Sequence, residues 1–158
     1  MKEFRQSFGK TRTAFDVKVL VILFVLLFLP AIWIVKSSIP AILGVIVFLL
    51  MIFHLLVMQL FYVILTDDKL IIKNGVYPFW KKEVRYIDIV KLRFIWYGGR
   101  SYPSMKVITK KSSKMSWRYT IDHVDPQDYS IIVEELKKKG VPVETKDLDM
   151  FVDMFKEK

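Results

Sequence analysis

The sequence contains no cysteine and only two histidines, His54 and His123, among its 158 residues. Without a thiol the chain can form no disulfide, use no cysteine nucleophile and hold no cysteine-ligated zinc or iron–sulfur centre. With only two histidines in the chain, a histidine-based metal site is not expected either. We therefore expect neither a metal nor another cofactor.

Glycine is scarce as well, and no glycine-rich phosphate-binding motif is present, because Gly98-Gly99 is not followed by the required glycine and lysine. The one polar cluster that could support catalysis or bind a metal is Asp122-His123-Val124-Asp125. It lies where a predicted strand gives way to a predicted helix, and Asp and His are common there as turn and capping residues. No serine nucleophile motif surrounds it. We therefore predict no catalytic residue and no enzyme.

Charge is missing from two long stretches near the N-terminus. Val19–Val35 is a run of 17 uncharged residues and Ile39–Leu60 is a run of 22, separated only by Lys36-Ser37-Ser38. As α-helices these runs would reach about 25 and 33 Å, close to the ~30 Å hydrocarbon thickness of a bilayer. The pattern predicts a transmembrane helical hairpin over residues 19–60, with spans at about 19–35 and 39–60.

The distribution of basic residues predicts the orientation of this hairpin. Residues 1–18 form a basic arm and basic residues follow the second run, whereas the tip carries only Lys36. Lys and Arg stay on the cytoplasmic side of a membrane, so a multi-pass protein of the bacterial cytoplasmic (inner) membrane with both termini cytoplasmic is expected. A cleaved signal peptide is disfavoured because no small-residue cleavage site follows the first run.

Two polar residues, His54 and Gln59, interrupt the second apolar run. Polar side chains inside a membrane are functional candidates by default. The alternative is structural: a neutral His54 would hydrogen-bond within the helix pair, and Gln59 would reach water at the cytoplasmic end. A single histidine without acidic partners favours the structural interpretation.

After residue 60 the apolar residues alternate with a period of two, which is typical of strands. Turn signals at Asp67-Asp68, Asn74-Gly75, 98–103 and 110–114 separate the alternating segments. The six expected strands cover residues 61–66, 70–73, 80–86, 90–97, 105–110 and 115–121. We expect an antiparallel sheet that curls into a barrel or sandwich, with Phe94 and Trp117 directed inward.

The period then changes to that of a helix. Asp125 is expected to cap it, Pro126 to occupy its first position and Gly140 to end it. An amphipathic stripe runs along this helix, and a second short amphipathic helix is expected within the acidic tail, 141–158. The stripe consists of Tyr129, Ile132, Val133 and Leu136.

This order of strands and helix, with the T-D-x-x-L-x-x-x-x-G pattern at Thr66–Gly75, resembles the bacterial pleckstrin-homology-like domains. The small membrane-tethered, YyaB-like group is the most similar. The resemblance covers about Phe61–Gly140. It implies a membrane-anchored α+β protein whose transmembrane hairpin precedes a PH-like antiparallel barrel or sandwich, over 61–140, capped by a C-terminal helix. It implies no enzymatic activity and carries over no catalytic residues.

Charge of one sign dominates the predicted strands. Between residues 69 and 118 basic residues outnumber acidic ones by 13 to 2, whereas residues 119–158 hold 6 basic and 10 acidic ones. An ordinary solvated face mixes both signs, so this imbalance predicts an anionic ligand. The candidate lipid- or partner-binding residues are Lys81, Lys82, Arg85, Lys91, Arg93, Lys110, Lys111 and Lys114.

The sequence therefore predicts a non-enzymatic, membrane-anchored binding module that docks anionic lipid or a protein partner at the cytoplasmic leaflet. The alternative is an accessory or regulatory subunit of a larger membrane complex, with His54 and Gln59 in contact with other spans. Nucleic acid is not expected as a partner of a membrane-tethered chain, although a basic sheet with aromatic residues is compatible with it. The oligomeric state stays open.

Overall fold

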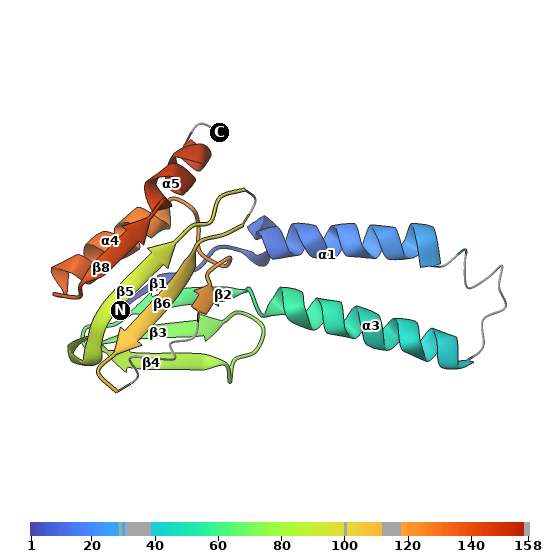
Figure 1. The fold of residues 1–158 in the computed structure, drawn as a ribbon, viewed down its shortest axis with the longest axis horizontal. Helices are drawn as coiled ribbons and strands as arrows, with labels where there is room; N and C mark the ends of the chain where they lie inside the picture. Colours follow the sequence, from blue (N-terminus) through green and yellow to red (C-terminus); the bar gives the residue numbers. More distant parts are fainter. Residues whose placement is uncertain (29, 31–38, 100, 112–117, 157–158) are drawn as a thin grey trace. The chain divides into compact units, whose positions relative to one another are not determined.

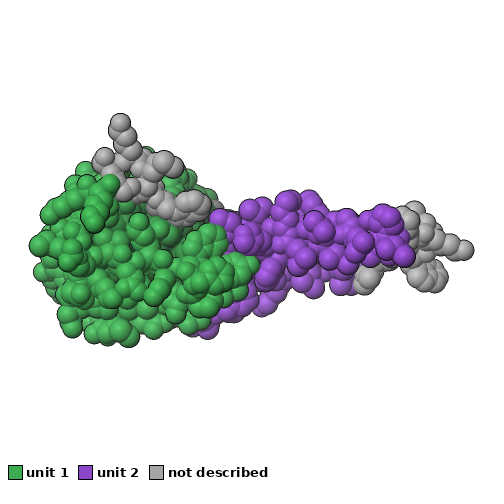
Figure 2. Space-filling model, turned by 90° about the horizontal axis from the view of Figure 1, so that it is seen from below, with its two compact units in different colours: residues 1–6, 59–158 green, residues 7–58 purple. Residues whose placement is uncertain are grey.

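The computed structural model describes residues 1–28, 30, 39–99, 101–111 and 118–156 (Figure 1). The chain divides into two compact units, coloured separately in Figure 2. The sheet unit comprises Met1–Gln6 and Gln59–Lys158, and the helical unit comprises Ser7–Met58. The basic N-terminal arm is thus shared between them, because its first residues join a sheet.

The helical unit begins with a short 3-10 turn, η1 (Phe8–Lys10), followed by α1 (Arg12–Leu23). The Thr11 hydroxyl accepts a hydrogen bond from the Ala14 N–H at 3.1 Å and so caps α1. A wider helical turn, η2 (Phe24–Phe28), continues α1, and α3 (Ile39–Val57) lies beside it (Figure 1). Both helices leave many large apolar side chains exposed.

No helix in the described part of the chain is long and apolar enough to cross a membrane. The predicted transmembrane hairpin is therefore wrong, and so is the assignment to the bacterial cytoplasmic membrane with both termini cytoplasmic. The reason is clearest in the first apolar run. There α1 begins among polar residues at Arg12, before the apolar run, and its regular α-helical geometry gives way to the wider η2 at Phe24. The expected tip, 36–38, lies outside the described residues.

The first sheet contains β1 (Lys2–Phe4), β2 (Phe61–Leu65), β3 (Lys69–Asn74) and β4 (Lys81–Arg85) in that spatial order. All three pairings are antiparallel. The register places Val63 opposite Ile72, and both side chains are fully buried. β2, β3 and β4 form where the alternation of apolar residues predicts strands, whereas β1 lies in the arm and was not expected.

The second sheet contains β5 (Ile89–Ile95), β6 (Ser104–Thr109), β7 (Arg118–Thr120) and β8 (Val143–Lys146), in the spatial order β7-β6-β5-β8. A short turn, η3 (Tyr86–Asp88), leads from β4 into β5. β8 pairs with β5 in parallel. The prediction of one antiparallel barrel or sandwich is therefore corrected to two four-stranded sheets, one of which includes a parallel pair.

Two C-terminal helices, α4 (Asp128–Lys138) and α5 (Leu148–Lys156), lie close to β8 (Figure 1). The predicted stripe of α4 is buried, and the Tyr129 hydroxyl donates to the Ile121 carbonyl at 2.6 Å. α5 adds Phe151, which is 2% exposed and packs against the Tyr129 ring at 5.4 Å. The acidic tail therefore contributes to the core.

The ends of α4 differ in how well local sequence predicts them. The helix begins at Asp128 after Gln127, so the expected cap by Asp125 is wrong. The Asp125 carboxylate instead accepts from the Gln127 N–H at 3.1 Å within the preceding turn. Gly140 ends the helix as expected, with φ of 75° and its N–H donated to the Lys137 carbonyl at 2.9 Å. The inward position of Phe94 is confirmed, and Trp117 lies outside the described residues.

Candidate functional site

The candidate site is the outer face of the second sheet. Along β5 the side chains of Leu92 and Phe94 are fully buried, so Lys91, Arg93 and Ile95 point outward by alternation. The neighbours of these outward residues lie on β6 and β8, and β7 lies beyond β6. One row across the sheet consists of Arg118 on β7, Lys106 on β6, Arg93 on β5 and Glu144 on β8.

We call the cations on this surface the basic face; its residues are Lys91, Arg93, Lys106, Arg118 and Lys146. Pairing partners that lie directly opposite each other share one side of a sheet. Arg93 is opposite Lys106, and Lys106 is opposite Arg118. Like charges in this position are destabilising. The fold therefore holds three mutually repelling cations on adjacent strands.

Glu144 partly neutralises the row at its β8 end. Its carboxylate pairs with Arg93 Nε at 2.7 Å and also with the Lys91 ammonium. Hydrogen bonds from Lys91 and then Arg93 hold the pKa of Glu144 below its ordinary value. Because these groups are exposed, the ion pairs are screened and contribute little to stability.

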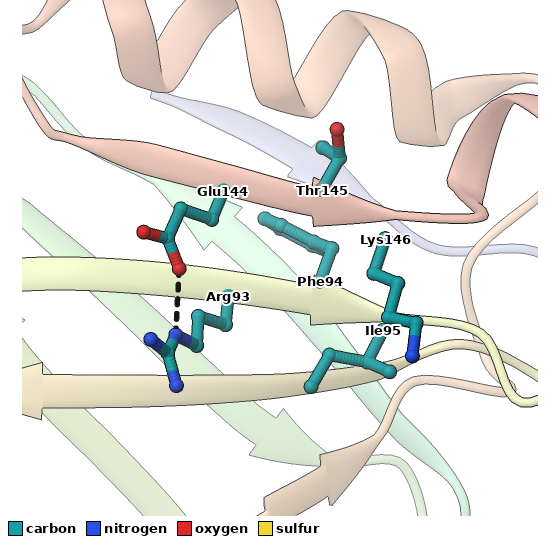
Figure 3. Close-up of a pocket in the computed structure, with 6 residues that line it drawn as sticks. All are labelled: Arg93, Phe94, Ile95, Glu144, Thr145 and Lys146. Carbon is teal, nitrogen blue, oxygen red and sulfur yellow. Dashed lines mark hydrogen bonds and ion pairs between the residues drawn. The ribbon is translucent and has the colours of Figure 1, made fainter.

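A shallow pocket of about 290 Å³ adjoins this ion pair between β5 and β8. Figure 3 shows the Arg93 guanidinium reaching the Glu144 carboxylate at one end, with Lys146 at the other. Its lining is Arg93, Phe94, Ile95, Glu144, Thr145 and Lys146. A carboxylate that entered from solvent would meet a cation at either end.

The other cations of the basic face have no carboxylate partner within the described ranges. Lys106 and Lys146 form no ion pair there, and the Arg118 guanidinium lies 5.0 Å from the centre of the Tyr97 ring. Arg118 is thus held by a cation–π contact, which leaves its charge uncompensated. The basic face retains an excess of positive charge even after its Glu144 pairs are formed.

The β4 cations predicted from the sequence lie in the other sheet. Lys81, Lys82 and Arg85 are exposed on β4, which does not pair with β5. Lys81 contacts Glu83 at 3.1 Å and Arg85 contacts Asp88 at 2.9 Å. The structure therefore does not gather the predicted cations on one surface, although Lys91 and Arg93 do lie in the basic face.

Two of the remaining predicted cations lie near the end of β6. Lys110 and Lys111 are exposed just beyond that strand, and Lys114 lies outside the described residues. Lys106 and Arg118 were counted in the charge excess and not chosen as site residues. The alternation of their strands could have identified them, whereas Glu144 and Lys146 depend on the parallel pairing of β8.

The polar residues of the second apolar run are both exposed. His54 lies on α3 in the helical unit. The Gln59 carbonyl accepts hydrogen bonds from the N–H groups of Phe61 at 2.9 Å and Asp122 at 3.3 Å. The intramembrane positions predicted for both residues depended on the spanning hairpin, which the described helices do not form.

The Asp122-His123 cluster is buried, with both residues only 2% exposed. The His123 ring meets the edge of the Tyr62 ring, and neither of its nitrogens has a hydrogen-bond partner among the described residues. Burial, and then the charge of Arg5, lower the pKa of His123. No group of three or more potential metal ligands occurs in the described part of the chain. Burial and a lowered pKa are consistent with a packing role for His123.

No protein-family model matches this chain, and no curated protein matches it in sequence. The resemblance to the pleckstrin-homology-like family stays a prediction.

Proposed function

We propose that this chain is a non-enzymatic binding module whose basic face docks an acidic segment of a partner protein. The row Arg118–Lys106–Arg93 carries the proposal, since it aligns three cations across adjacent strands. Glu144 is the one carboxylate on this face among the described residues. An acidic segment laid along the row would relieve the repulsion between these cations and supply the missing counter-charges.

The surroundings of the row favour a protein segment over other anions. A lipid surface would be expected to engage an exposed apolar anchor, but Ile95 and Ile108 beside the row are only half-exposed. Single-stranded nucleic acid would need open aromatic faces for stacking, and one face of the Tyr97 ring, which is 60% exposed overall, is occupied by the Arg118 guanidinium. Guanidinium groups suit carboxylates because they bind them through two parallel hydrogen bonds.

The test is the binding of the full-length chain to a labelled glutamate-rich peptide, followed by fluorescence anisotropy. The glutamine counterpart of the peptide measures the contribution that does not depend on charge. We expect the double variant Lys106→Glu/Arg118→Glu to weaken binding about tenfold or more, because it reverses two charges of the row. Binding should also weaken as salt is raised.

The matched control is Lys110→Glu/Lys111→Glu, which changes the net charge equally at exposed positions outside the row. It should bind the acidic peptide within about twofold of the unchanged protein, a difference below about 0.5 kcal/mol. Equal losses in both double variants would show attraction by overall charge and would contradict a site at the row. Stronger competition by a single-stranded oligonucleotide than by the acidic peptide would assign the face to nucleic acid instead.

A further inference from the structure

The loop between β3 and β4 presents an aromatic side chain to solvent. Phe79 is 79% exposed and Val76 is 44% exposed. Figure 1 shows this loop extending past the ends of the two strands. We call residues 75–80 the aromatic tip. A single exposed apolar side chain is common on protein surfaces, so the way this loop is held and the charges beside it decide whether it is an interaction site.

The aromatic tip is anchored to the core through its own rings. Phe61, which is buried, packs against Trp80 with ring centres 5.8 Å apart. The ring centres of Trp80 and Tyr77 are 6.1 Å apart, and those of Tyr77 and Phe79 are 5.5 Å apart. A continuous series of rings therefore leads from the core to the outermost phenylalanine, so Phe79 is positioned before any partner arrives.

The backbone of the tip is also prepared for an apolar environment. The buried Asn74 side chain accepts hydrogen bonds from the N–H groups of Val76 and Tyr77, each at 2.9 Å. The N–H groups of Asn74, Gly75, Trp80 and Lys81 donate to carbonyls within the chain, and Pro78 has none to satisfy. Burying an unpaired N–H in an apolar medium is costly, and most donors of this loop are already paired.

Cations lie directly behind the apolar tip. Lys73 and Lys81 face each other where β3 and β4 meet the loop, and Lys82 follows. Lys81 contacts Glu83 at 3.1 Å, whereas Lys73 and Lys82 form no ion pair with the described residues. The order from the outside inward is thus aromatic first and cationic second. Anionic lipid presents the complementary order, with acyl chains beneath negative headgroups.

We propose that the aromatic tip inserts into the headgroup region of an anionic lipid surface, with Lys73, Lys81 and Lys82 in contact with the headgroups. This contact is peripheral and needs no helix that spans the bilayer. It is independent of the acidic segment proposed for the basic face, because the two surfaces lie on different sheets. An apolar pocket of a protein would fit Phe79 but would not require the internally paired backbone.

The experiment uses the absence of cysteine from the chain, which allows one dye to be attached at one position. The full-length variants Phe79→Cys and Ile87→Cys each carry an environment-sensitive fluorophore. Ile87 is the control because it is also apolar, is 71% exposed, and follows β4 at the end away from the tip. The probe vesicles contain phosphatidylcholine with or without phosphatidylserine. Each dye reports the environment of its own position, so insertion of the aromatic tip can be detected even if other apolar surfaces of the protein also contact the vesicle.

We expect the dye at position 79 to shift to shorter wavelength with phosphatidylserine vesicles and the dye at position 87 to stay unchanged. In the position-79 protein, the added change Lys81→Glu/Lys82→Glu should raise the lipid concentration for half-maximal response about tenfold or more. About 0.5 M salt should act in the same direction.

Three results would overturn the proposal. Equal shifts at positions 79 and 87 would mean that the aromatic tip inserts into the vesicle no more deeply than the control position. Equal responses to vesicles with and without phosphatidylserine would exclude recognition of negative headgroups. No response at position 79 with either vesicle would exclude lipid and leave a protein pocket as the partner of Phe79. Since peptide binding at the basic face is measured without vesicles, failure of one proposal is distinguishable from failure of the other.

Discussion

Replacing Gly75 by alanine should destabilise the sheet unit. The same change stabilises a protein where the glycine has an ordinary φ angle and there is room for a Cβ atom. The φ angle of Gly75 lies outside the left-handed region, so alanine would restrict the unfolded chain and add about 0.4–1 kcal/mol to the free energy of unfolding. In this fold, however, a Cβ at position 75 would overlap His123 Nδ1 and lie 2.7 Å from His123 Cε1.

The His123 ring has little freedom to move away. It is 2% exposed, and its ring centre lies 5.8 Å from that of Tyr62. Its backbone is fixed on both sides, because its N–H donates to the Phe61 carbonyl at 3.2 Å and its carbonyl accepts from the Gln6 N–H at 3.0 Å. Overpacking at such a site costs about 1–3 kcal/mol. After the gain from chain entropy, a net loss of up to about 2.6 kcal/mol is expected.

Hydrogen exchange of the β2 and β3 amides in the full-length chain measures this loss within the sheet unit. The double variant Gly75→Ala/His123→Ala tests the cause, because removing the ring removes the overlap. It should lose less stability than the sum of the single changes, by at least about 1 kcal/mol. Gly9→Ala, which adds a Cβ with no atom within 4 Å, serves as the control. A stabilising Gly75→Ala, or strictly additive changes, would refute the close approach.

Two further predictions concern the core. Leu136→Ala on α4 should lower the free energy of unfolding by about 2–5 kcal/mol, as measured by the same exchange experiment. Ile131→Ala, on the exposed side of α4, should lower it by less than about 0.5 kcal/mol. Similar losses for the two variants would show that α4 does not cover the core. The pKa of His123 is below its ordinary 6.5 in the folded chain, so the unfolded chain binds a proton at this ring more readily than the folded chain does. Stability should therefore fall as pH decreases below about 6.5, and His123→Gln should remove this part of the pH dependence; an unchanged profile would contradict the burial of a neutral ring.

The periodicity of the apolar residues by itself predicted most of the secondary structure of the sheet unit. Alternation along residues 90–97 predicted a strand whose Leu92 and Phe94 point inward, and the structure has both side chains buried on β5 (Ile89–Ile95). The stripe on α4 and its end at Gly140 were predicted for the same reason. These features follow from local geometry, because side chains two apart share a strand face and those three or four apart share a helix face.

The apolar runs of the N-terminal region show the limit of this reasoning. A length of uncharged sequence indicates that apolar side chains are present, but it does not determine where a continuous helix begins and ends. α1 starts at Arg12, before the first apolar run, and the described helices are not long and apolar enough to cross a membrane. The second run does form a helix near its predicted bounds, α3 (Ile39–Val57), so the prediction was right about a helix there and wrong about a membrane span.

The candidate site was also predicted only in part. Sequence alone determined that positive charge is concentrated in the strands and that Lys91 and Arg93 point outward from β5. Only the tertiary structure decided which cations meet, because Lys106 and Arg118 join the row through strand pairing, and Glu144 joins it through a parallel strand about 50 residues farther along the chain. β8 is short and mostly exposed, so it has no alternation of apolar and polar residues from which a strand could be predicted. Side-chain alternation is a property of one strand, whereas the choice of neighbours depends on how the whole chain packs around its core.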